Sequence, residues 1–319
     1  MKLRMPPALL RMGLRGARPL FTSSRLPIST KRTLVDLLSQ GAQLPRGTRI
    51  QGTDHIGGVE VERVLPPNSS DSHTLLYLHG GGYALGSARG YTGFAANLGA
   101  AAGMKVILVE YRRAPEHPFP HALDDALAVY RALVSSAEDA SKVVIAGDSA
   151  GGGLTLALAM ALRDNGDHLP AALGLICPWA DLAADVEHRR KAGTDPLIIP
   201  SLISDWAPAY VGSADAANPL ISPVYGDLHG LPPVVLHSAG QDPISADSHL
   251  LEKLFHDNNS GSIVEHFHNP RRWHVYHLQV GFLRDADDAV KHLGQRLAAY
   301  AKHPRQQRQS GFTHNGQVV

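Results

Sequence analysis

The sequence has little of what would mark a disulfide-stabilised, membrane-spanning or nucleic-acid-binding protein. Its 319 residues include one cysteine, Cys177, so no disulfide can form within the chain, which is compatible with a reducing compartment. No apolar run approaches the roughly 18 residues of a spanning helix. The 30 basic and 29 acidic residues leave a net charge of +1, which gives no reason to expect a nucleic acid or an anionic membrane as partner. We expect Cys177 to be a small core residue of a globular protein.

The start of the chain is basic, which allows two interpretations. Residues 1–35 contain eight lysines or arginines and no acidic residue. Such a segment is typical of a mitochondrial transit peptide, but it can also be an amphipathic segment that packs over an active site. We favour the second interpretation and a cytoplasmic protein, with a mitochondrial location as the alternative.

The rest of the chain is organised around one stretch near its middle. The β-branched run 143–145 predicts a buried strand, and residues 154–162 are rich in helix formers. Between them, Gly147 and Gly151 flank Ser149 at the spacing G-x-S-x-G, which alone could also be a flexible glycine-rich turn. The order strand, tight turn, helix instead predicts the nucleophile elbow of an α/β-hydrolase, with Ser149 as nucleophile.

Apolar strands alternate with helices along most of the chain, which predicts an α/β fold with a mostly parallel sheet covered on both faces. Strands are expected at 48–55, 58–65, 74–78, 105–111, 143–145, 173–177, 234–237 and 263–267, and helices at 89–103, 123–133, 154–162 and 282–301. A loop is expected at 66–71. The irregular stretch 181–225 breaks the alternation. We therefore expect a cap segment at 1–45, a catalytic core at 46–180 and 226–303, a cap insertion at 181–225 and a flexible tail at 304–319.

A nucleophilic serine needs a base and a carboxylate that orients the base, in the chain order Ser, Asp or Glu, His. Asp242 follows the strand 234–237 and a glycine turn, which is the position expected of the carboxylate. A turn or N-cap role is the ordinary alternative for an aspartate before proline. Asp247 is the nearest rival, but it lies one turn into the next helix, where its side chain is less free to meet the base.

The base should lie between the last strand and the last helix, where the sequence has four histidines. His266 and His268 fall within or at the end of the expected strand. His274 lies in the middle of the following loop and is our predicted base, with His277 as the alternative. The spacing of the four matches no zinc pattern, so we expect neither a metal nor a cofactor.

A glycine run after an early strand predicts the oxyanion hole, because glycine lets backbone N–H groups approach the substrate. His79 is followed by three glycines, as in the HGGG loop of lipases and esterases. We predict the N–H groups of Gly80, Gly81 and Ala150 as donors. A phosphate-binding loop is the alternative, but the lysine and the spacing that it requires are absent.

Taken together, these motifs make the sequence similar to the hormone-sensitive-lipase-like esterases, also called bacterial family IV, of the α/β-hydrolase fold. The matching segments are YLHGGGYALGS (77–87), VEYRRAPEHPFPHALDDA (109–126), AGDSAGGGL (146–154), NPLISP (218–223), LPPVVLHSAGQDP (231–243) and WHVY (273–276). The resemblance covers most of 75–300. It implies the same triad (Ser149, Asp242, His274) and the same oxyanion donors, with a cap built from the N-terminal segment and an insertion after the sixth strand.

The sequence departs from the family pattern in three places. Arg113 stands where the family usually has an apolar residue. The segment 242–247 reads DPISAD in place of DPLRDE, and 269–273 replaces a short glycine-containing loop before His274. The last departure bears on which histidine is the base.

The predicted activity is that of a serine carboxylesterase acting on short- to medium-chain acyl esters through an acyl-enzyme intermediate. A lactone hydrolase or an amidase would use the same triad, and a non-catalytic ligand-binding relative is a further alternative. The expected partner is a small-molecule ester. The resemblance also suggests a homodimer formed along 263–267.

Overall fold

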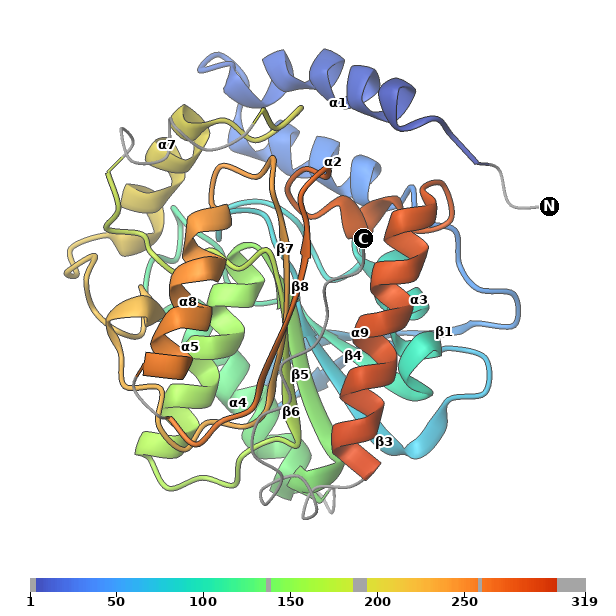
Figure 1. The fold of residues 1–319 in the computed structure, drawn as a ribbon, viewed down its shortest axis with the longest axis vertical. Coiled ribbons are helices and arrows are strands. Elements are labelled where there is room, and N and C mark those ends of the chain that lie inside the picture. Colours follow the sequence, from blue (N-terminus) through green and yellow to red (C-terminus); the bar gives the residue numbers. More distant parts are fainter. Residues whose placement is uncertain (1–3, 136–138, 186–193, 258–259, 303–319) are drawn as a thin grey trace.

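The computed structural model of the protein describes residues 4–135, 139–185, 194–257 and 260–302 (Figure 1). Within these ranges the strands form one eight-stranded sheet in the order β1-β2-β4-β3-β5-β6-β7-β8. The strands are β1 (Arg49–Ile56), β2 (Val59–Leu65), β3 (Ser70–Leu78), β4 (Met104–Val109), β5 (Val143–Asp148), β6 (Ala172–Ile176), β7 (Val234–Ala239) and β8 (Val264–Asn269).

The sheet is parallel except at β2, which runs antiparallel to both β1 and β4. The pairs Leu76↔Ile107 and Leu76↔Ile145 give the register at the centre, where β3 lies between β4 and β5. Strands β3 to β8 therefore end at one edge of the sheet. Loops that follow these strands meet there, which is where an α/β protein places its site.

Two layers of helices cover the sheet. Helices α3 (Thr92–Ala102) and α9 (Arg284–Lys302) pack on one face, and α4 (His121–Ser135), α5 (Ala150–Asp164) and α8 (Ser245–Asp257) pack on the other (Figure 1). The first 13 residues of α5 are all buried. Each buried leucine side chain there contributes about 1.5–3 kcal/mol to stability, so the helix behind Ser149 is held firmly.

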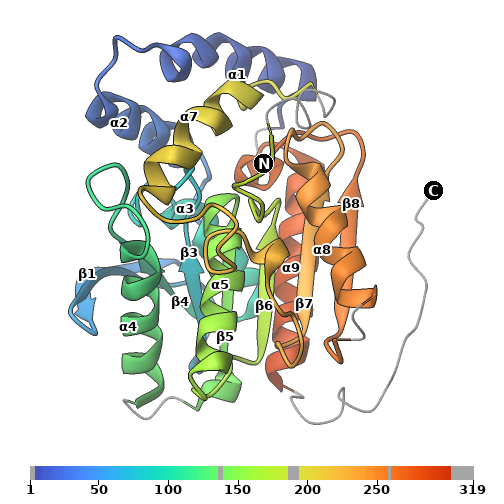
Figure 2. The same cartoon turned by 90° about the vertical axis from the view of Figure 1, so that its left-hand side faces the viewer.

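A cap of three described helices lies over the carboxyl edge of the sheet (Figure 2). These are α1 (Pro7–Thr22), α2 (Ile28–Ser39) and α7 (Pro200–Val211). Phe21 of α1 and Leu202 of α7 pack with Leu85 of the body in a small apolar cluster. Arg32 donates hydrogen bonds to the carbonyls of Ala84 (2.8 Å) and Ala114 (3.0 Å). The basic N-terminal segment is thus part of the cap, as the preferred interpretation of the sequence predicted.

The observed elements agree closely with the predicted ones. The predicted α/β fold class is confirmed, and Cys177 is a core residue, 1% exposed. The loop expected at 66–71 is shorter, because β3 begins at Ser70, whose N–H donates to the Gly103 carbonyl at 2.9 Å. The tail expected at 304–319 lies outside the described residues.

None of the described helices has the length and apolar character needed to cross a bilayer. The part of the chain that the structure describes also contains three short 3-10 helices, η1 (Ala140–Lys142), η2 (Pro223–Tyr225) and η3 (Tyr276–Gln279).

Candidate active site

Ser149 lies on a sharp turn between β5 and α5. Its backbone has φ 52° and ψ −120°, a strained combination for a residue with a side chain. A Cβ on Gly147 would lie 2.2 Å from the Gly151 carbonyl oxygen, and one on Gly151 would lie 2.0 Å from the Leu78 carbonyl oxygen. Both positions therefore require glycine, which is the physical reason for the G-x-S-x-G pattern. The backbone N–H of Ser149 donates to the Ile176 carbonyl at 2.9 Å, which fixes the turn against β6.

Asp242 and His274 form a buried pair at the same edge of the sheet. His274 Nδ1 lies 2.8 Å from Asp242 Oδ2, and the side chains are 7% and 0% exposed. Asp242 Oδ1 also accepts the N–H of Ile244 at 2.9 Å, which orients the carboxylate. Burial alone would lower the pKa of His274, but the nearby carboxylates, Asp242 first and then Asp195 and Asp148, together outweigh it and raise the pKa above its ordinary value. The Asp242 carboxylate is therefore placed to stabilise the positive charge of the His274 ring after the ring accepts a proton.

The rival residues are occupied elsewhere. Asp247 Oδ2 accepts the N–H groups of Ala180 and Asp181, both at 3.0 Å, so it holds the loop after β6. His277 is fully buried, and its Nε2 lies 3.1 Å from His237 Nδ1. The structure thus brings His274, and not His277, to Asp242.

Asp195, which the sequence analysis did not single out, lies against His274, the predicted base. Its Oδ2 accepts the backbone N–H of His274 at 2.6 Å, and its Oδ1 accepts those of Leu197 and Ile198. Burial raises its pKa to about 6. Asp195 belongs to the irregular cap insertion, where no periodicity or motif signals a partner for a distant histidine. Its carbonyl accepts from Arg18 of α1 at 2.6 Å, so both parts of the cap reach the base.

Cys177 also lies beside the pair. Its Sγ, a carboxylate oxygen of Asp242 and a ring nitrogen of His274 all lie within 4.8 Å of one another. Burial and the nearby Asp242 carboxylate raise the pKa of the thiol well above its ordinary value. Cys177 is therefore a neutral packing neighbour of the pair and not a second nucleophile.

The glycine loop after β3 differs from its predicted role at one position. The N–H of Gly80 donates to Asp148 Oδ1 at 2.9 Å, so it does not point toward a substrate. The prediction of Gly80 as an oxyanion donor is therefore wrong in this structure, because β3 and β5 are neighbours and bring the two residues together. Among the described residues, no acceptor is bonded to the N–H groups of Gly81, Gly82 and Ala150.

Asp148, next to Ser149, is the buried acceptor that holds this loop. It is 1% exposed and also accepts the hydroxyls of Tyr77 at 2.7 Å and Tyr91 at 3.2 Å. Burial raises its pKa to about 6, although these donors favour the charged form. Its position ties the oxyanion loop to the elbow.

The cap insertion packs directly on the glycine loop. A Cβ on Gly82, which has φ +62°, would lie 2.5 Å from Cε3 of Trp206 on α7. The ring of Tyr83 stacks on that of Tyr210, with centroids 3.6 Å apart and planes 5° apart. Aromatic side chains of the cap therefore form a wall beside the N–H groups of this loop.

Arg113, the departure from the family pattern, supports the end of the same loop. It pairs with Glu110 at 2.9 Å and donates to the Gly86 carbonyl. Glu110 in turn accepts the N–H of Ala88 at 2.6 Å. A charged residue is accommodated here because both of its partners belong to the adjacent loops.

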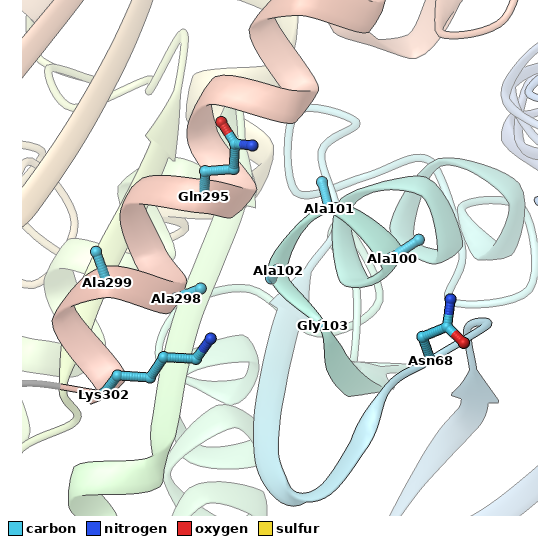
Figure 3. Close-up of a pocket in the computed structure, with 9 residues that line it drawn as sticks. All are labelled: Asn68, Ala100, Ala101, Ala102, Gly103, Gln295, Ala298, Ala299 and Lys302. Atoms are coloured by element: carbon cyan, nitrogen blue, oxygen red, sulfur yellow. The ribbon is translucent and has the colours of Figure 1, made fainter.

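A surface hollow between α3 and α9 is not part of this site (Figure 3). It is lined mainly by small residues, with Asn68, Gln295 and Lys302 as its polar side chains. Asn68 and Gly103 precede β3 and β4, so the hollow lies at the amino edge of the sheet, opposite the cap. It offers no pairing of a nucleophile with a base.

The strained serine turn in a sheet of this strand order defines the α/β-hydrolase class. A family model described as the alpha/beta hydrolase fold matches residues 75–278. LipR of Mycobacterium tuberculosis, whose name describes an acetyl-hydrolase, is 54% identical over 292 residues, which cover 92% of this chain and 94% of LipR. An acetyl-hydrolase of Streptomyces hygroscopicus is 39% identical over 240 residues, 75% of this chain and 79% of that protein.

Solved structures give the same result. The crystal structure of an esterase from the bacterial hormone-sensitive lipase family has a TM-score of 0.86 and 30% identity, and the match covers 93% of this chain and 100% of that one. A hormone-sensitive lipase from a metagenome library has a TM-score of 0.86 and 31% identity, over 94% of this chain and 99% of that one. The chain belongs to the hormone-sensitive-lipase-like family of α/β-hydrolases, whose members are serine ester hydrolases.

Proposed function

We propose that the protein is a serine carboxylesterase with Ser149 as nucleophile, His274 as base and Asp242 as the carboxylate that orients the base. The observation that carries the proposal is the buried Asp242–His274 pair, 2.8 Å apart, at the sheet edge where Ser149 is held in its strained turn. Among the described residues Ser149 Oγ has no hydrogen-bond partner, and the contact with His274 is one that we propose forms with bound substrate.

The reaction follows from these positions. His274 Nε2 takes the proton of Ser149 Oγ as the oxygen attacks the ester carbonyl, and Asp242 stabilises the imidazolium that results. The proton then passes to the leaving alcohol, and an acyl-serine forms. Water, deprotonated by His274, then attacks the acyl carbonyl. The bond to Ser149 Oγ breaks, His274 returns the proton to this oxygen, and the acid is released.

We propose Gly81, Gly82 and Ala150 as the donors to the oxyanion. This set keeps two of the predicted donors and replaces Gly80, whose N–H is bonded to Asp148. Ala150 begins α5, so its N–H is one of the groups that a helix leaves without an internal partner. Such donors stabilise the charge that develops on the carbonyl oxygen.

We propose short- to medium-chain acyl esters as substrates. The aromatic wall formed by Trp206, Tyr83 and Tyr210 limits the space beside the glycine loop. The acetyl-hydrolase names of the two relatives point to a small acyl group. Lactones and amides could use the same residues and are tested alongside. Residues 1–45 and 181–225 act in this proposal as a cap over a catalytic core formed by 46–180 and 226–303.

The test is hydrolysis of p-nitrophenyl esters from acetate to palmitate by the wild type and by Ser149→Ala. We expect turnover of the short esters, and a loss of about 10³-fold or more in the variant. Ser213→Ala, which removes an exposed serine, is the matched control and should keep wild-type rates. A folded wild type that is inactive at every chain length, or an active Ser149→Ala, would contradict the proposal. A lactone and a p-nitroanilide measure the two alternatives directly.

A further inference from the structure

A second group of titratable side chains lies between α8 and β8, outside the proposed active site. His249 and Glu252 are three residues apart on α8, and His266 and His268 are two residues apart on β8. These spacings place each pair on one face of its element. The two elements lie side by side (Figure 2), and the ring of His249 is 5.3 Å from that of His266 and 5.0 Å from that of His268. The two faces therefore meet.

The hydrogen bonds inside this group orient one histidine closely. His266 Nδ1 lies 2.7 Å from Glu252 Oε2, and its Nε2 lies 2.7 Å from Ser238 Oγ. The same hydroxyl lies 2.7 Å from His268 Nδ1. The side chain of His266 is 5% exposed, whereas His249 is exposed to solvent. The group is thus anchored on its inner side and open on its outer side.

We propose that His249, Glu252 and His266 form a binding site for a divalent transition-metal ion of the Zn²⁺ type. One ligand atom from each of the three lies within 4.8 Å of the others. Two imidazoles and a carboxylate are a known zinc donor set, and the open outer side leaves room for water as a further ligand. Imidazole donors favour zinc, copper and nickel over calcium and magnesium, which prefer oxygen ligands.

The side chains next to His266, Ser238 and His268, can keep their hydrogen bonds when a metal ion is bound. When the ion occupies Nδ1 of His266, the ring proton moves to Nε2 and is donated to Ser238 Oγ. The serine hydroxyl then donates to His268 Nδ1. No net proton is lost, and Ser238 fixes the ligand ring as outer partners of metal sites do.

The site would join two elements that lead into the active site. Helix α8 follows Asp242, and β8 precedes the loop that carries His274. A bound ion would bridge them on the surface. Because it binds only the folded chain, it would raise the free energy of unfolding with the logarithm of its concentration once that exceeds the Kd. This site is separate from the Cys177–Asp242–His274 group, which is more deeply buried and contains the proposed base of the active site.

The test is titration of chelator-treated, full-length protein with Zn²⁺ in a competition assay with a fluorescent zinc indicator. We expect one site per chain. Ser238→Ala should weaken binding by roughly 10–100-fold, and His249→Ala and Glu252→Gln, which remove ligands, should weaken it further. Neither ligand side chain is fully buried, so both variants should fold. His229→Ala is the matched control, because His229 forms an exposed histidine–carboxylate pair with Asp227 at 2.6 Å. It should bind as the wild type does.

A second measurement is the Tm as a function of Zn²⁺ concentration. It should rise with added ion in the wild type and in His229→Ala, and stay constant in His249→Ala. The proposal is overturned by the lack of saturable binding, or by wild-type binding in both His249→Ala and Glu252→Gln. It is also overturned if Cys177→Ser alone abolishes binding, because the ion would then belong to the group around His274.

Discussion

Replacing Asp148 by asparagine tests how the buried carboxylate next to Ser149 is stabilised. The carboxylate accepts one backbone N–H, from Gly80, and the hydroxyls of Tyr77 and Tyr91. An asparagine keeps one oxygen for Gly80 and Tyr77 and presents its amide group toward Tyr91, whose hydroxyl can accept. The substitution therefore removes the charge while keeping most of the hydrogen bonds.

The magnitude follows from the pKa of Asp148, which burial raises from 3.8 to about 6. A pKa difference of one unit corresponds to 1.36 kcal/mol, so the ionised carboxylate costs the folded state about 3 kcal/mol at neutral pH. Because the pKa is higher in the folded state, this loss of stability develops as the pH rises from about 4 to about 6. The asparagine variant lacks the loss. Its advantage over the wild type should be near zero at pH 4 and about 3 kcal/mol at pH 7 and above.

The assay is urea unfolding of both proteins at several pH values between 4 and 8. The same preparations give the pH profile of ester hydrolysis. The Asp148 carboxylate contributes to the raised pKa of His274, so its removal should move the acid limb of kcat/KM to lower pH. This direction follows because the base must be neutral to accept the serine proton.

Asp148→Ala is the control for the hydrogen bonds. It leaves three buried donors without an acceptor, at about 1–3 kcal/mol each, so it should be less stable than the asparagine variant by at least about 3 kcal/mol at every pH. If the asparagine and alanine variants lose stability alike relative to the wild type, the folded protein requires the charge of Asp148 and not its role as a hydrogen-bond acceptor. A pH-independent difference between asparagine and wild type would refute the reasoning from burial.

Two further substitutions test the contacts between the cap and the site. Gly82→Ala should lower kcat by about 10²-fold or more, because its Cβ would meet Trp206 at 2.5 Å and displace a proposed oxyanion donor. Gly230→Ala is the control for backbone strain alone, because Gly230 has φ +69° but its Cβ would have no contact closer than 3.9 Å. This variant should keep the wild-type rate. Asp195→Ala should lower kcat and shift the acid limb of the pH profile to lower pH, since a nearby negative charge is removed from His274; an unchanged profile would reduce Asp195 to a structural role.

The elbow was predictable from the sequence because its geometry forbids side chains. Gly147 and Gly151 are required by contacts near 2 Å, and such a requirement is visible directly in the residue type. Asp242 was predictable for a related reason, since parallel strands end at one edge and the residues that follow them are the candidates. The choice of His274 over its neighbours depended on its position in the middle of the loop after the last expected strand, and the family resemblance implied the same residue.

The contacts that could not be predicted depend on tertiary neighbours. The three glycines after His79 are alike in sequence, and which N–H faces the substrate is decided by the pairing of β3 with β5, which brings Gly80 to Asp148. Asp195 lies in an irregular insertion without a period. His266 is near His274 in sequence, yet the strand directs it toward α8, where its partner is Glu252.

The cap does more in this structure than cover the site, because its polar contacts reach the segments that hold Asp242 and His274. Arg11 donates to the side chain of Gln241, the residue before Asp242. Arg18 donates to the carbonyl of Asp195, whose carboxylate accepts the N–H of His274. Movement of α1 would therefore disturb both loops at once. In the proposed mechanism His274 is the base, and a displacement of about 1 Å can lower the rate about 10²-fold, so we expect these contacts of α1 to support catalysis.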